Sequence, residues 1–141
     1  MRGTFRCVSD ERRAMMPDLI KRVVQGVASA HGVRAKVEFS ALYPVTVNDA
    51  SVNEGVGEIA RSLLGEGDVQ EMPAPIMGAE DWSYVLQRIP GVMVSLGARP
   101  RDRKLSGYPQ NHSNLVVFDE DAMAVGAALY AAVGQRLDPD A

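Results

Sequence analysis

The sequence is poor in the residues that cross-link a chain or bind metals. Its 141 residues contain one cysteine, Cys7, and two histidines, His31 and His112. A single cysteine excludes an internal disulfide and fits a reducing compartment. A zinc-type site takes three or four ligands, so an isolated histidine is weak evidence for a metal centre.

Long apolar runs and an excess of positive charge are also missing. No apolar run approaches the roughly 18 residues of a membrane-spanning helix. The N-terminal segment lacks the apolar core of a signal peptide. The formal net charge of -3 gives no reason to expect nucleic acid or an acidic membrane as a partner. We therefore expect a soluble, cytoplasmic protein that binds neither membrane nor nucleic acid.

The remaining composition is that of a folded protein. Hydrophobic residues make up 46% and charged residues 23% of the chain, as in globular domains. The segment 2–9 is rich in β-formers and predicts a strand. A helical pattern follows, beginning near Pro17 and ending at Gly32. Residues 34–40 alternate between apolar and charged side chains and predict a second strand. This strand, helix, strand order favours an α+β layer with one solvent-facing side of the sheet.

The pattern changes between residues 41 and 49, where turn residues interrupt the periodicity. After this break the sequence predicts two long helices, a short helix ending at Gln87 and two short apolar strands. The first long helix carries an apolar face over 52–64, and the last runs from Asp119 to about Leu137. The strands cover residues 69–72 and 91–97. Helices alternating with so few strands resemble the closing half of a larger α/β domain.

His112 is the first candidate functional residue, in the polar sequence "NHSN" ahead of an acidic helix start. A neutral imidazole there can bind a metal, act as a general base or simply face solvent. The residues alone leave these alternatives open. His31 has a structural explanation, because a cation at a helix C-terminus eases the negative end of the dipole.

The sequence "MGAEDWSY" is the second candidate. Gly78 could let the backbone approach a ligand while Glu80 lines a pocket. Alternatively, Glu80 and Asp81 are acids that favour a helix N-terminus, and spacing cannot separate the two explanations. The basic run of residues 99–104 fits a solvated loop better than a nucleic-acid site, because no aromatic residue lies within it.

Read in order, these segments resemble the C-terminal part of a known enzyme family. The segments are "RGTFRCVSDERR", "AHGVRAKVEF", "YPVTVND", "EMPAPIMGAEDWSYVLQRIPG", "SLGA" and "NHSNLVVFDEDAMAVGAALYAA". They resemble the amidohydrolase branch of the aminoacylase and carboxypeptidase metallopeptidases. That branch includes hippurate hydrolases, N-acyl-amino-acid hydrolases and plant indole-acetyl-amino-acid hydrolases. The likeness covers nearly the whole chain.

The resemblance implies an α/β (α+β) fold in two parts. Residues 1–40 would be the end of a small lid domain with an antiparallel sheet, whose exposed face could form a homodimer. Residues 41–141 would be the second half of the α/β metallopeptidase catalytic domain.

The resemblance also implies functional roles. His112 matches the last ligand of a divalent metal pair, manganese or zinc. Arg6 matches a lid arginine that could meet a substrate carboxylate, and Gly78, Glu80 and Asn111 match the substrate-binding surroundings. The implied reaction is metal-assisted hydrolysis of an N-acyl amino acid. The other ligands and the general-base glutamate belong to a part of the family that these residues do not match.

We therefore expect no catalytic residue in this chain and no meaningful activity from it alone. The alternative hypothesis is a non-catalytic association module derived from the same family.

Overall fold

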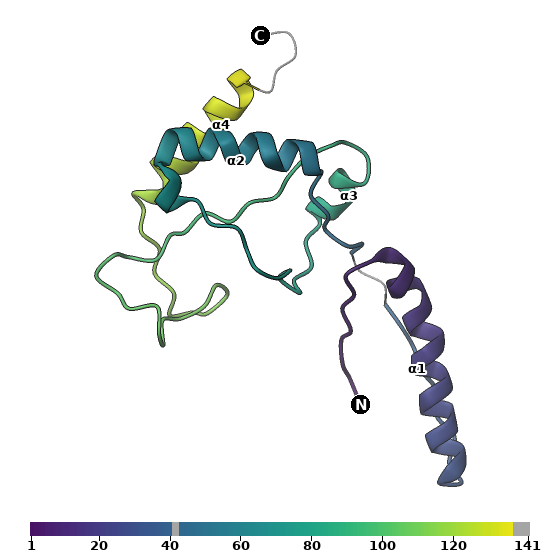
Figure 1. Ribbon diagram of the computed structural model, residues 1–141. Helices are drawn as coiled ribbons and strands as arrows, with labels where there is room; N and C mark the ends of the chain where they lie inside the picture. The colour runs from purple at the N-terminus through teal and green to yellow at the C-terminus, as the bar shows by residue number, and fades with distance from the viewer. Residues whose placement is uncertain (41–42, 137–141) are drawn as a thin grey trace. The chain divides into compact units, whose positions relative to one another are not determined.

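The computed structural model describes residues 1–40 and 43–136, and its regular elements are helices (Figure 1). They are α1 (Asp10–Ala30), α2 (Ala50–Leu64), the short 3₁₀ helix η1 (Glu66–Asp68), α3 (Trp82–Leu86) and α4 (Ala122–Arg136). The chain divides into two compact units. Unit 1 consists of residues 1–49 and 71–91, and unit 2 of residues 50–70 and 92–141.

The predicted α/β (α+β) fold with an antiparallel lid sheet is wrong for the described residues, which contain no strand. The four segments expected as strands are irregular, because none of them forms a backbone ladder with a neighbour. Alternating apolar residues suit a half-buried pleated surface, but they form a strand only where a partner strand exists. Phe5 and Phe39, from the first two segments, meet edge to face at 6.2 Å. These segments therefore approach through side chains, and the expected dimer-forming sheet face is not built.

Helix α1 begins earlier than predicted. Ser9 is its N-cap, and the Ser9 hydroxyl accepts a hydrogen bond from the Arg12 N–H at 3.3 Å. Acidic residues in the first turn complement the helix dipole. Pro17 lies inside the helix, where it removes one backbone donor. The cap and the acidic first turn explain why the helix starts at Asp10 and not near the proline.

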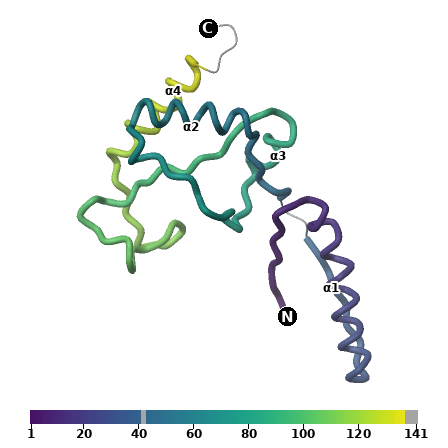
Figure 2. The backbone as a smooth tube through the Cα atoms, in the orientation of Figure 1, coloured from purple at the N-terminus to yellow at the C-terminus, as the bar shows by residue number. Residues whose placement is uncertain are grey.

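The end of α1 confirms the predicted stop at Gly32. Gly32 has a φ of 67°, and its N–H donates to the Ser29 carbonyl at 3.0 Å. The Val33 N–H donates to the Ala28 carbonyl at 3.0 Å, which completes a Schellman motif. The chain then returns alongside the helix (Figure 1 and Figure 2), and the Lys21 ammonium lies 5.8 Å from the centre of the Phe39 ring.

Asp10 joins three segments of unit 1. Its two carboxylate oxygens accept hydrogen bonds from the Val45 N–H at 3.3 Å and from the Gln87 side-chain amide at 3.1 Å. A backbone bond of 2.9 Å from Asp49 to Gly91 adds a second link between these segments. The predicted domain boundary between residues 40 and 41 adjoins residues 41–42, which lie outside the described residues, and it stays a prediction.

Unit 2 is built on contacts between α2 and α4. The buried residues Val56, Ile59 and Ala60 lie on one side of α2, as its apolar periodicity predicts. A Cβ placed on Gly126 of α4 would lie 3.2 Å from the Leu96 side chain. The missing side chain therefore lets the segment around Leu96 lie close to α4. The predicted end of this helix at Leu137 lies outside the described residues.

No helix within residues 1–40 and 43–136 is both long and apolar enough to cross a membrane.

Candidate functional site

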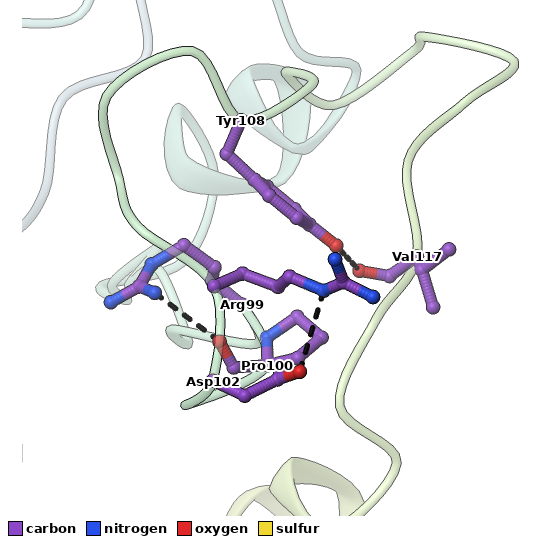
Figure 3. Close-up of polar contacts among 6 residues, drawn as sticks. Arg99, Pro100, Asp102, Tyr108 and Val117 are labelled. Atoms are coloured by element: carbon purple, nitrogen blue, oxygen red, sulfur yellow. Dashed lines mark hydrogen bonds and ion pairs between the residues drawn. The ribbon is translucent and has the colours of Figure 1, made fainter.

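His112 lies in the loop of residues 99–118, which is closed by two hydrogen bonds. At its base, the Asp119 N–H donates to the Ala98 carbonyl at 2.8 Å. Further along, the Tyr108 hydroxyl donates to the Val117 carbonyl at 2.6 Å (Figure 3). The bond between Asp119 and Ala98 encloses the whole loop, whereas the bond between Tyr108 and Val117 encloses only the part around His112.

His112 occupies a strained position in a reverse turn. The Ser113 N–H donates to the Gln110 carbonyl at 3.0 Å, which closes a turn with Asn111 and His112 at its centre. His112 has a φ of 73° and is the one non-glycine residue with a positive φ among those described. A positive φ at the third residue alone marks a type II turn, where glycine or asparagine is usual. A left-handed conformation costs a larger residue about 1–2 kcal/mol, and such strain often marks a functional position.

Side chains next to His112 support the same turn. The Asn111 side-chain oxygen accepts a hydrogen bond from the His112 N–H at 3.2 Å. The Ser113 hydroxyl accepts one from the Leu115 N–H at 3.2 Å. Local bonds of this kind stabilise turns. The Asn111 side chain thus helps to hold the turn. Its predicted contact with substrate stays a prediction.

The imidazole of His112 is exposed to solvent. In the described part of the chain no group of three or more His, Cys, Asp or Glu side chains is arranged to hold a metal ion. The described residues therefore form no ligand set around His112, because zinc and manganese sites need several donors.

The basic run of the loop is exposed, as a solvated loop predicts. The Arg99 guanidinium donates to the Pro100 carbonyl at 3.2 Å (Figure 3). Arg103 pairs with Asp102 at 3.5 Å. A shallow hollow nearby is lined by four acidic residues, one arginine, one proline and one phenylalanine: Pro100, Arg101, Asp102, Phe118, Asp119, Glu120 and Asp121. The loop therefore neutralises part of its own positive charge.

Gly78 and Glu80 lie in an exposed segment of unit 1 that leads into α3. Asp81, the N-cap residue of α3, makes no side-chain capping bond. Ser83 is fully buried, and its hydroxyl donates to the Glu80 carbonyl at 2.5 Å. Sequence reasoning missed Ser83. A serine three residues after a candidate site residue, at the start of a helix, was the available signal.

Arg6 is exposed and lines a shallow apolar hollow of unit 1. The other residues that line it are Cys7, Val8, Arg12, Met15, Met16, Leu19 and Met77. Met77 precedes Gly78, so the structure brings Arg6 close to one end of the Gly78–Glu80 segment. Asn111 and His112 belong to unit 2. The functional roles of all five residues stay predictions.

The sequence is similar to a known protein family and to several curated proteins. The sequence model of "Peptidase family M20/M25/M40" matches residues 6–136. Thermostable carboxypeptidase 2 of Saccharolobus solfataricus is 34% identical over 132 residues, which cover 93% of this chain and 32% of that protein. IAA-amino acid hydrolase ILR1-like 6 of Arabidopsis thaliana is 31% identical over 138 residues, which cover 95% of this chain and 29% of that protein.

N-acetylcysteine deacetylase of Bacillus subtilis is 28% identical over 131 residues, which cover 93% of this chain and 32% of that protein. The chain thus spans about a third of the length of the curated relatives it matches. No solved structure matches.

Proposed function

Because the chain belongs to the peptidase family M20/M25/M40, we propose that it is part of a metal-dependent amidohydrolase that cleaves N-acyl amino acids. The match over residues 6–136 carries the proposal. The names of the three relatives, a carboxypeptidase, an IAA-amino acid hydrolase and an N-acetylcysteine deacetylase, share one substrate feature. Each describes cleavage of an amide bond between an acyl group and an amino acid.

His112 is the residue of this chain that we propose as a metal ligand. Its exposed imidazole at the tip of a turn is an accessible donor. A pair of divalent ions, manganese or zinc, supplies Lewis-acid polarisation of the amide carbonyl and an activated water when bound. The described residues provide no ligand cluster, so His112 would hold a metal only together with ligands from elsewhere in the complete site. We propose that the other ligands and the general-base glutamate lie in the part of the relatives that this chain does not span.

Arg6 is the proposed contact for the substrate carboxylate. Its exposed guanidinium forms no ion pair within the described residues, and a guanidinium binds carboxylates through two parallel hydrogen bonds. Glu80 and Gly78 would line the same substrate region, with the Ser83 hydroxyl fixing the Glu80 carbonyl. Asn111 would contact substrate beside the metal ligand.

A chimera tests this proposal. Residues 6–136 would replace the matching third of thermostable carboxypeptidase 2, and hydrolysis of N-acetyl and N-benzoyl amino acids would be measured with added manganese or zinc. We expect metal-dependent hydrolysis that falls by about 100-fold or more in His112→Asn, because each ligand supports binding of the metal. His31→Asn is the matched control and should leave the rate unchanged.

Two results would contradict the proposal: a folded chimera without hydrolysis, or one whose rate is the same with His112→Asn. If the large chimera does not fold, exchanging only residues 98–121 into the relative tests the role of His112 separately.

A second candidate function, an association module, is favoured by the apolar side chains that unit 2 exposes. Leu115 is 71%, Met123 68% and Tyr130 84% exposed. Exposed apolar side chains favour association with another surface where they form a patch. Sedimentation of the purified chain tests this candidate, because a concentration-independent monomer would exclude self-association.

A further inference from the structure

We propose that Tyr108 is the positioning residue for His112, acting through its hydrogen bond to the Val117 carbonyl. The relevance of this role to metal binding rests on the proposed function. The role itself concerns the conformation of the loop and is testable without a metal. Tyr108 and Val117 are nine residues apart in the sequence, and His112 lies between them. The bond, drawn in Figure 3, therefore links the two ends of the segment that contains His112.

The two hydrogen bonds that close the loop enclose different lengths of chain. The bond between Asp119 and Ala98 closes the base of the loop just ahead of α4. The Tyr108 bond is formed inside the loop and encloses two successive turns, Gln110–Ser113 and Ser113–Val116. Because the base is closed independently, loss of the Tyr108 bond should loosen these two turns and leave the rest of unit 2 intact.

His112 needs such support more than its neighbours do. The turn Leu105–Tyr108, closed by a bond of 3.2 Å, has Gly107 at its third position with a φ of 77°. Glycine adopts this conformation without steric penalty. The next turn places His112 at the same position with a φ of 73°, where a side chain is disfavoured. A strained residue persists only where its surroundings hold it, and the tyrosine bond supplies that restraint.

The test compares the 141-residue chain with Tyr108→Phe, which keeps the ring and removes the hydroxyl. Amide hydrogen exchange followed by NMR reports on the two turns through the N–H groups of Ser113 and Val116. We expect both to exchange about fivefold faster in Tyr108→Phe, as loss of one typical hydrogen bond predicts. The one-bond Cα–Hα coupling of His112, which is sensitive to the sign of φ, should shift toward the value for negative φ.

Two controls separate positioning from general destabilisation. Tyr130→Phe removes a hydroxyl from the same unit at an 84% exposed residue and should change neither readout. The amides of Gly32 and Val33, in the Schellman motif of unit 1, should exchange at unchanged rates in every variant.

A double-substitution cycle addresses the strain directly. His112→Gly removes the steric penalty at φ 73°, so the turn should no longer depend on the tyrosine. We expect the effect of Tyr108→Phe on Ser113 exchange to shrink from about fivefold to less than about twofold in the His112→Gly background.

Three results would overturn the proposal: an equal effect in both backgrounds, faster exchange throughout unit 2, or an unchanged coupling at His112. Failure of the proposed function would show separately, as a folded chimera whose hydrolysis does not depend on His112.

Discussion

Gly107 and His112 occupy the same position in two successive turns of one loop, with φ values of 77° and 73°. Each turn is closed by a backbone bond between its first and last residues. Glycine is the usual residue at such a position and histidine is not. The backbone at His112 thus adopts the conformation that glycine adopts at Gly107. Backbone strain of this kind clusters at functional positions, which supports the metal-binding role that we propose for His112.

Replacing Gly107 by alanine should lower the free energy of unfolding by about 1 kcal/mol, because alanine is strained at positive φ. Gly97→Ala is the control in the same unit, since Gly97 has no heavy atom near the position of a new Cβ and no positive φ. Urea unfolding of both variants measures the difference. Equal midpoints and slopes would show that the turn at Gly107 does not restrain the loop.

His112→Gly should raise the free energy of unfolding by up to about 1 kcal/mol. Relief of the left-handed strain stabilises the folded state, and the greater freedom of glycine in the unfolded chain offsets part of the gain. His112→Ala, which retains the strain, should leave stability nearly unchanged. Urea unfolding distinguishes them, and a glycine variant less stable than the alanine variant would contradict the strain at His112.

Ser83→Ala should lower the free energy of unfolding by about 1 kcal/mol. The variant removes a buried donor from the Glu80 carbonyl, which keeps its bond from the Ser83 N–H at 3.2 Å. Ser95→Ala, at an exposed serine, should change stability by no more than about 0.5 kcal/mol. If both variants unfold at the same urea concentration, the Ser83 hydroxyl does not hold the segment that carries Glu80.

Ser9→Ala should lower the stability of α1 by about 1 kcal/mol, because the Arg12 N–H loses its capping oxygen. Ser29→Ala, at an exposed position within the same helix, should have the opposite sign, since alanine favours helix interiors. Exchange of the Arg12 amide by NMR reports on the cap. An unchanged rate in Ser9→Ala would show that the hydroxyl is not a cap in solution.

How much of the fold could be predicted depends on the range of the interactions. The stop of α1 at Gly32 follows from a few neighbouring residues, and its prediction was right. The predicted start near Pro17 was wrong because the N-cap residue, Ser9, lies more than two helical turns before the proline. The strands failed for a different reason. At residues 34–40 apolar and charged side chains alternate, as in a strand. A sheet also needs a neighbouring strand for its backbone hydrogen bonds, and no local sequence pattern shows whether one is present.

In the candidate site, too, features set by neighbouring residues could be predicted and features set by more distant residues could not. His112 could be singled out from its polar surroundings. Its positive φ could not be predicted, because only a few per cent of non-glycine residues adopt that conformation, although histidine is enriched among them. The bond from Tyr108 to Val117 joins residues nine positions apart, and no periodicity signals it. Ser83 was overlooked because serine at a helix start is common, and only its complete burial sets it apart.

The proposal that His112 is a metal ligand is tested most directly by the metal content of the folded chimera. The chimera of residues 6–136 with thermostable carboxypeptidase 2 would be dialysed against manganese or zinc, and bound metal counted per chain by elemental analysis. We expect two ions per chain before substitution and at least one fewer in His112→Gly, with the fold preserved because glycine suits the turn. An unchanged metal count in a folded His112→Gly chimera would contradict it.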